Sequence, residues 1–180
     1  FSMMDLFREE SVRKVNTGLN SFLFILAWAG MILFGFLALS FLMALFSGAL
    51  NVPVIAGLIV SGVLTFLCYR LRNNQRIEYD YTFTNGTFDI ARVINNNKRK
   101  KLLTTEIKEF EVIAPTSDEG FQRMLQYPGI KKLNYFLNRG GGLYYGIFTH
   151  EGQKSILIFE PSDELIQMFR KTNPRIVKTA

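Results

Sequence analysis

Hydrophobic and polar residues are distributed in three different patterns along the chain. The longest pattern, an almost uninterrupted apolar stretch, predicts membrane helices. No residue from Ser21 to Tyr69 is charged, and this stretch holds two apolar runs, Phe22 to Phe46 and Val52 to Tyr69. A helix rises about 1.5 Å per residue, so the first run more than crosses a hydrocarbon core of about 30 Å and the second just suffices. Because unpaired backbone groups are excluded from hydrocarbon, both runs should be helices.

The short interruption between the two runs has the composition of a turn. Ser47, Gly48, Asn51 and Pro53 supply it, and Pro53 suits the first turn of the following helix. A cleaved signal peptide is the competing interpretation of the first run, but that run is much longer than an apolar signal region of about 7 to 15 residues. We therefore predict a two-helix transmembrane hairpin over residues 20–72.

The polar residues inside these helices do not indicate transport. Channels and transporters need ionisable or strongly polar groups in the membrane, and this stretch offers mainly Ser40, Ser61 and Thr65. Their hydroxyls are expected to return to carbonyls of the preceding turn. The small pairs Ala44 with Gly48 and Gly57 with Ser61 would let helices approach closely. The hairpin is most simply an anchor.

A weaker helical pattern precedes the hairpin. Met4, Phe7, Ser11 and Val15 recur at a spacing of three to four residues. This spacing predicts a short interfacial helix, so residues 1–19 are interpreted as an N-terminal interfacial segment.

Behind the hairpin the period changes to two, which indicates strands. Residues 77–84 alternate between apolar and polar side chains, and Asn85-Gly86 favours the type I′ turn of a β-hairpin. Further extended runs are expected at residues 87–93, 102–113, 133–137, 143–149 and 155–159. Ser162 then fits an N-cap for one amphipathic helix that ends before Pro174. Short strands followed by one helix predict a mainly-β (α+β) domain over residues 73–180, a small antiparallel barrel or sandwich.

The distribution of charged residues predicts how the hairpin is oriented in the membrane. The chain carries a formal charge of +6, and residues 73–180 hold 16 Lys and Arg against 12 Asp and Glu. Arg8, Arg13 and Lys14 precede the first helix, whereas the turn between the helices carries no Lys or Arg. Cations flanking membrane helices favour the cytoplasmic side, so we expect a multi-pass protein of the cytoplasmic (inner) membrane with both termini in the cytoplasm.

Several segments of the sequence resemble a known family. They are IEYDYTFTNGTFDIA at residues 77–91, KRKKLL at 98–103, IKEFEVIAP at 107–115, IFEPSDEL at 158–165 and NPRIV at 173–177. The chain resembles an uncharacterised bacterial family of small two-helix membrane proteins with a pleckstrin-homology-like (PH-like) cytoplasmic domain. The resemblance implies the fold and a membrane location, and it brings no catalytic residues. The resemblance covers the hairpin and most of residues 77–178, and residues 116–142 contain no stretch that we can assign to it.

The basic run Lys98, Arg99, Lys100 and Lys101 is the main candidate site. It is interpreted as a loop, and each cation near an anionic leaflet gains about 1 kcal/mol. Arg70, Arg72 and Arg76, which follow the second apolar run, are further candidates for lipid contact, and Lys131, Lys132 and Arg139 are candidates to extend the patch. A solvated tip that keeps the domain soluble is the alternative. Nucleic acid is a weak candidate, because no aromatic residues are interleaved with the run.

Catalytic, metal and cofactor chemistry find little support. Cys68 is the single cysteine and His150 the single histidine, so neither can build a metal site alone. Gly140-Gly141-Gly142 lacks the Lys-Ser/Thr and the helix of a phosphate-binding loop. Cys68 is either a packing residue or a palmitoylation site. We expect no enzyme activity, no cofactor and no metal.

Two functions from different classes remain. The first is a membrane-anchored, non-catalytic binding or scaffolding module that recognises a protein partner or assembles with itself, with the basic run near anionic headgroups. The second is a lipid- or small-ligand-responsive regulator with a pocket in the β domain. A concave apolar pocket would favour the regulator, and a filled core with an exposed aromatic patch would favour the module.

Overall fold

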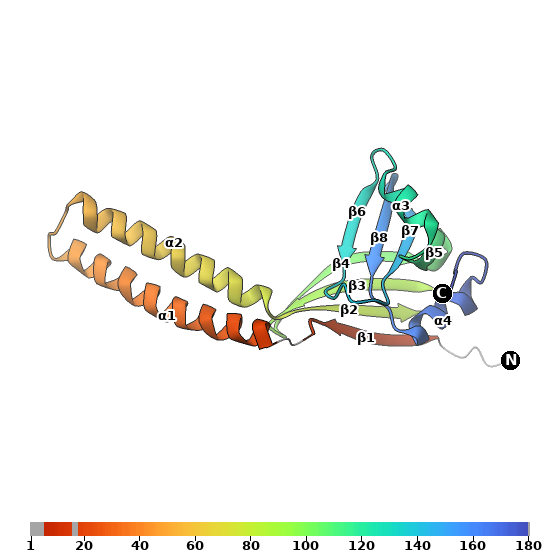
Figure 1. Cartoon of the computed structure of the whole chain (residues 1–180), viewed down its shortest axis with the longest axis horizontal. Helices are drawn as coiled ribbons and strands as arrows, with labels where there is room; N and C mark the ends of the chain where they lie inside the picture. The colour runs from red at the N-terminus through yellow and green to blue at the C-terminus, as the bar shows by residue number, and fades with distance from the viewer. Residues whose placement is uncertain (1–5, 16–17, 180) are drawn as a thin grey trace. The chain divides into compact units, whose positions relative to one another are not determined.

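The computed structural model describes residues 6–15 and 18–179, and the chain forms two compact units (Figure 1). One unit, residues 15–77, is the helical hairpin. The other unit combines the chain up to Lys14 with the chain from Glu78 onward. The hairpin is therefore an insertion within the sequence of the β unit.

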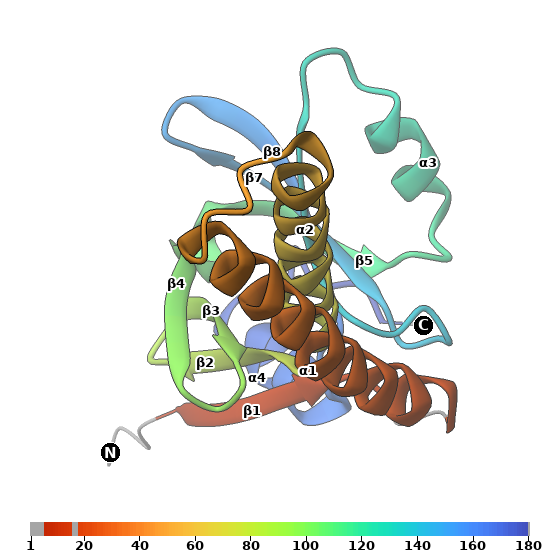
Figure 2. The ribbon, with the colours of Figure 1, turned by 90° about the vertical axis from the view of Figure 1, so that its left-hand side faces the viewer.

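The hairpin consists of α1 (Gly18–Phe46) and α2 (Val52–Asn74), seen from the connecting loop in Figure 2. Gly48 adopts a φ of +94° in that loop, which a residue with a Cβ rarely does. Asn51 is the N-cap of α2, and its side chain accepts a hydrogen bond from the Val54 amide at 3.1 Å. Pro53 lies in the first turn, as expected.

Small residues set the contact between the helices. A Cβ at Gly30 would lie 2.7 Å from Cys68 Sγ, and one at Gly57 would lie 2.5 Å from the Phe41 ring. Cys68 is thus a packing residue against α1, and the Gly57–Ser61 pair does bring the helices close. The serine and threonine hydroxyls bond backward, as predicted: Ser40 to Phe36 O, Ser61 to Gly57 O and Thr65 to Ser61 O, at 2.9, 2.7 and 2.8 Å.

Outside this contact the hairpin presents apolar side chains to its surroundings. Nearly all residues in the apolar stretches of α1 and α2 are unburied, and Phe36, Met43 and Phe46 are among the most exposed. Both helices are long and apolar enough to cross a membrane. Exposed apolar helices of this length indicate that the protein associates with a membrane.

Sheet A of the β unit has the strand order β1-β2-β3-β4. The strands are β1 (Phe7–Arg13), β2 (Ile77–Thr84), β3 (Thr87–Ile94) and β4 (Lys98–Glu106). The predicted turn at Asn85-Gly86 is confirmed, with φ angles of 47° and 97°. A bulge between Ile90 and Ala91 interrupts the β3–β4 pairing.

The predicted interfacial helix at the N-terminus is wrong, because residues 7–13 form strand β1. They pair antiparallel with β2 from Phe7↔Thr84 to Arg13↔Glu78. Exposed and half-buried side chains alternate along β1, which is the period of a strand. The helical spacing was weak, and pairing with a distant strand overrides it. Met4, also part of that prediction, lies outside the described residues. The segment assigned to 1–19 thus contributes a strand to the β unit.

Sheet B has the order β5-β7-β8-β6. A 3₁₀ turn (Ile107–Glu109) leads into β5 (Phe110–Pro115), and the others are β6 (Lys131–Tyr135), β7 (Tyr144–His150) and β8 (Gln153–Phe159). The helix α4 (Asp163–Thr172) follows, capped by Ser162 as predicted. Strand β6 pairs parallel to β8, a departure from the all-antiparallel expectation.

Aromatic rings join the two sheets and α4 into one core. Phe88 of sheet A lies with its ring centroid 5.0 Å from Phe169 of α4 and 5.6 Å from Phe159 of sheet B. Phe83 packs edge-on against Phe169 at 5.3 Å. All four side chains are at most 1 % exposed, so the core between sheets and helix is filled.

Residues 116–142, which sequence reasoning left open, cover the other face of sheet B. They contain α3 (Glu119–Leu125), and Phe121, Met124 and Leu125 pack against buried residues of β5, β7 and β8. Strand β8 is accordingly buried without alternation from Ser155 to Phe159, as a strand covered on both faces should be. Sheet A, by contrast, carries charged side chains on the face that points away from α4.

Candidate binding surface

The basic run lies on a strand and not on a loop, which corrects the sequence-based interpretation. Residues 98–101 are the first four residues of β4, and all four are exposed. The loop before them is Asn95-Asn96-Asn97, where Asn95 and Asn96 adopt positive φ angles of 52° and 54°. Because β4 ends the strand order of sheet A, the run lies along an edge.

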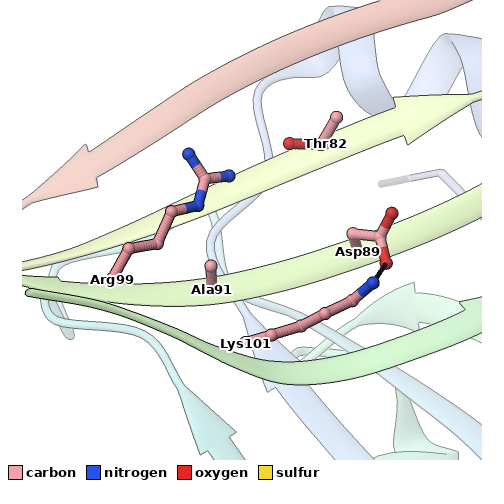
Figure 3. A pocket seen from close by; sticks show the side chains of 5 residues that line it. All are labelled: Thr82, Asp89, Ala91, Arg99 and Lys101. Atoms are coloured by element: carbon pink, nitrogen blue, oxygen red, sulfur yellow. Dashed lines mark ion pairs between the residues drawn. The ribbon is translucent and has the colours of Figure 1, made fainter.

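Strand geometry divides the four cations between two faces of the sheet. Arg99 and Lys101 lie on the face away from α4, and both meet carboxylates; Figure 3 shows the ion pair between Lys101 and Asp89. Arg99 Nη1 is 3.4 Å from Asp80 Oδ2, and Lys101 Nζ is 3.1 Å from Asp89 Oδ1. Asp80 also accepts a hydrogen bond from Ser11 at 2.6 Å. Half of the run is therefore already neutralised within sheet A.

An open depression of about 430 Å³ lies on the same face. Thr82, Asp89, Ala91, Arg99 and Lys101 line it, and in Figure 3 the small Ala91 side chain lies between the two long cations. The lining residues are mostly polar or charged and the depression is open, unlike the enclosed pocket that usually holds a small molecule.

Lys98 and Lys100 occupy the opposite face, beside Arg92 of β3. Arg92 is the register partner of Lys100. None of these three cations forms an ion pair within the described part of the chain, and Arg92 Nε is buried without a hydrogen-bond partner. The result is a basic rim, defined as Arg92, Lys98 and Lys100.

Two tyrosines adjoin the basic rim. The rings of Tyr79 and Tyr135 lie 6.0 Å apart. Burial raises the pKa of both phenols above the usual value, and the positive charge of Arg92 opposes that shift. Both hydroxyls therefore stay protonated at neutral pH. Sequence reasoning did not assign Arg92 or Tyr135 to a site, because the neighbours of Arg92 and Tyr135 come from distant parts of the sequence.

Lysines also mark the free edge of sheet B. Lys131 and Lys132 lie on β6, the last strand in that order, and both are exposed. The edge at β5 is instead covered, because the Ile113 amide donates to Ile176 O at 2.8 Å and the Lys178 amide donates to Ile113 O at 2.8 Å. Charged edge strands resist unwanted strand pairing, so protection of the edges is a structural role for both basic runs.

The hairpin arginines contact aromatic rings at the end of α2. The Arg72 guanidinium lies 4.9 Å from the Trp28 ring centroid and 5.0 Å from that of Tyr69. The Arg76 guanidinium lies 4.3 Å from the Phe24 ring. Arg70 is exposed. Aromatic and cationic side chains together are typical of the level where a helix leaves the hydrocarbon.

The remaining polar candidates have local structural partners. Tyr145 Oη donates a hydrogen bond of 2.8 Å to Asp118, the N-cap of α3. That bond lowers the pKa of Asp118, while burial and this same carboxylate raise the pKa of Tyr145 to about 12. His150 lies 3.9 Å from Glu151 at a turn. Gly141 and Gly142 both adopt positive φ in a connection between strands.

Comparison with known proteins places this architecture in a family. A family model described as Bacterial PH-like domain (DUF6106) matches residues 4–179. The chain belongs to this family. The match includes β1 and the hairpin, so the DUF6106 pattern comprises the inserted helices together with the PH-like domain. No curated protein and no solved structure matches the chain. The resemblance identified from the sequence is thus confirmed.

Proposed function

We propose that this PH-like protein is a membrane-anchored, non-catalytic binding or scaffolding module. The observation that carries the proposal is the insertion of two exposed apolar helices between the paired strands β1 and β2. Arg13 and Glu78 are register partners, so the two ends of the hairpin are held together by the sheet. If both helices cross the membrane, the chain returns to the side on which it started, and β1 can pair with β2. A single crossing would leave the two strands on opposite sides.

The proposed orientation is a domain at the cytoplasmic face of the inner membrane. Arg8, Arg13 and Lys14 precede α1, and Arg70 and Arg72 lie near the end of α2. The loop between the helices carries no cation. This distribution supports a cytoplasmic location for both ends. Cleavage after α1 as a signal peptide would remove β1 from its sheet, which argues against that alternative.

Single-cysteine labelling tests this topology. In a Cys68→Ala background, Ser47→Cys lies in the loop between the helices and Lys171→Cys lies on α4, and both positions are exposed. We expect a membrane-impermeant maleimide to label Ser47→Cys on intact cells and Lys171→Cys only after permeabilisation. Labelling of both positions from outside would contradict the proposed orientation.

We further propose that the basic rim faces anionic headgroups and that Arg99 and Lys101 contribute less. Among the residues that the structure describes, no carboxylate pairs with a rim cation, whereas the cations on the other face do have such partners. Each free lysine near an anionic surface gains about 1 kcal/mol. Arg70, Arg72 and Arg76 would hold the hairpin end at the same interface.

A matched pair of variants tests the rim. The experiment uses an engineered domain, called the graft, in which an Asn-Gly turn replaces the hairpin and joins residues 6–14 to residues 77–180. The graft retains β1. We expect Lys98→Ser/Lys100→Ser to weaken its binding to phosphatidylglycerol vesicles by about thirtyfold at low salt. Arg99→Ser/Lys101→Ser is the control and should weaken binding much less. Equal losses in both variants would remove the distinction between the faces.

The structure gives less support to a ligand-responsive regulator. The depression at Ala91 is open to solvent, and the core between the sheets is filled with aromatic rings. In the described β unit, Phe7 and Tyr127 are the exposed large apolar side chains, and they form no broad aromatic patch. Recognition by the module would therefore rely on charged and polar surface.

A further inference from the structure

Strand β6 leaves one backbone edge of sheet B open. It is the last strand in the order of that sheet, as Figure 1 shows, and its strand partner is β8. Within the described residues, no backbone–backbone hydrogen bond joins residues 131–135 to a segment other than β8. An edge of this kind is a template onto which an extended segment can add as a further strand.

The hydrogen bonds at the end of β6 show which backbone groups point outward. The Tyr81 hydroxyl donates to Tyr135 O and accepts from the amide of Glu160, the residue that follows β8. It bridges the two strand ends, so the Tyr135 carbonyl points towards β8. Successive residues of a strand direct their backbone polar groups to opposite sides, and those of Lys132 and Asn134 therefore point to the open edge.

The side chains along this edge are exposed and basic. Lys131, Lys132 and Asn134 are all exposed. Among the residues that the structure describes, no carboxylate forms an ion pair with Lys131 or Lys132. In β4, the other basic edge strand, two of the four cations are already paired with carboxylates. The β6 edge thus combines two adjacent positive charges with outward backbone donors and acceptors.

These lysines select the charge of a strand that could pair here. A second copy of β6, paired antiparallel about Leu133, would bring four lysines and no carboxylate into one short ladder. Parallel pairing of two copies would place like charges directly opposite each other, which is destabilising. The same two lysines that exclude a basic strand favour an acidic one.

We propose that β6 binds an acidic, extended segment of a partner protein, which adds antiparallel to sheet B as its fifth strand. The partner residues opposite Lys132 and Asn134 exchange both backbone hydrogen bonds with them. Because the partner runs in the opposite direction, an apolar residue opposite Leu133 precedes two acidic residues opposite Lys132 and Lys131. The inference rests on the proposed function and deepens it, since it names the kind of partner that the module recognises.

An NMR titration of the full chain in phosphatidylcholine nanodiscs tests the proposal. The probe is the peptide acetyl-Ser-Val-Thr-Val-Glu-Glu-Ser-amide, with its Thr opposite Asn134 and its two Glu opposite Lys132 and Lys131. We expect saturating peptide to slow hydrogen exchange of the Lys132 and Asn134 amides by about tenfold or more, with the amides of β1 and β4 unchanged. Unchanged exchange in β6, or protection of another edge instead, would overturn the proposal.

Charge reversal tests whether the two lysines select the peptide. Lys131→Glu/Lys132→Glu should weaken binding by about tenfold or more, and a peptide with Lys in place of both Glu should bind this variant instead. Arg170→Glu/Lys171→Glu makes the same change in net charge at exposed positions of α4 and should bind as the parent does. Equal losses in both variants would show a general attraction between charges and no site at β6.

Asn134→Pro tests strand pairing separately from charge. It removes an outward N–H and leaves the ladder with β8, because proline is tolerated on an edge strand where its nitrogen faces solvent. We expect binding about tenfold weaker than for Asn134→Ala. N-methylation of the peptide at Thr and at the first Glu blocks the same ladder without changing the protein and should abolish binding. Unchanged binding of the methylated peptide would overturn the proposal.

A bilayer contact is the competing use of these lysines. Protection of β6 amides by phosphatidylglycerol in the nanodisc, with no protection by the peptide, would assign Lys131 and Lys132 to the membrane and overturn the proposal. The maleimide labelling and the vesicle assay of the basic rim test the membrane-anchored module without the peptide. A failure of the peptide site is therefore distinguishable from a failure of the proposed function.

Discussion

A fragment of residues 73–180 is expected to be less stable than the graft that adds β1 by about 3 kcal/mol or more. The fragment keeps seven strands and the helices of the β unit, but it lacks the ladder from Phe7↔Thr84 to Arg13↔Glu78. It also leaves Ser162 without the Glu10 carboxylate, and a hydrogen bond to a charged group contributes about 1.5 to 3 kcal/mol.

Urea unfolding of the fragment and of the graft measures this difference. The graft joins Lys14 to Ile77 through Asn-Gly, because a two-residue turn matches the register Arg13↔Glu78. A graft carrying Glu10→Gln isolates the contribution of the carboxylate and should fall between the two. Equal midpoints for fragment and graft would mean that β1 adds no stability to the domain.

Phe88→Ala is expected to destabilise the grafted domain by about 3 to 5 kcal/mol. The Phe88 side chain is fully buried and contacts Tyr81, Phe159 and Phe169, with centroid distances of 5.9, 5.6 and 5.0 Å. Removing the ring leaves a cavity between sheet A, sheet B and α4, which rigid neighbours cannot fill.

Denaturant unfolding measures this cost, with Tyr127→Ala as the control. The Tyr127 side chain is 46 % exposed, so its removal should cost less than about 1 kcal/mol. A loss below about 1.5 kcal/mol for Phe88→Ala would show that the core relaxes around the missing ring. The core described for the PH-like domain would then be looser than its contacts indicate.

Local signals in the sequence predicted much of the fold. The hairpin, the Asn85-Gly86 turn and the Ser162 cap each depend on residues that are neighbours in the chain, and all three are present. Backbone chemistry of this kind is largely independent of distant contacts. The DUF6106 match then confirmed the PH-like domain as a whole.

Two of the errors concern strands whose partners are distant in the sequence, and the third concerns an edge strand. Strand β1 reads FREESVR, which has no apolar alternation, and its partner β2 begins only after the hairpin. The basic run of β4 resembled a loop because an edge strand is solvated on several sides. Parallel pairing of β6 with β8 likewise depends on the long connection through α3.

The division of the basic run also depended on structure. A list of four adjacent cations does not show that Arg99 and Lys101 meet Asp80 and Asp89, because these carboxylates come from other strands. Nor does it show that Arg92 is the partner of Lys100 across a bulged ladder. Alternation along a strand separates the two pairs, and only the register determines what each pair meets.

The position of β1 ahead of the hairpin affects the order in which the chain folds during synthesis. Ribosomes add about 5 to 20 residues per second, so Arg13 leaves the ribosome several seconds before Thr84, the far end of β2, is made. During that interval the apolar helices emerge and β1 has no partner. The β2–β3 hairpin forms from neighbouring residues, whereas β1 can pair only after both helices and β2 have been made. Of the strands in sheet A, β1 thus waits longest for its partner.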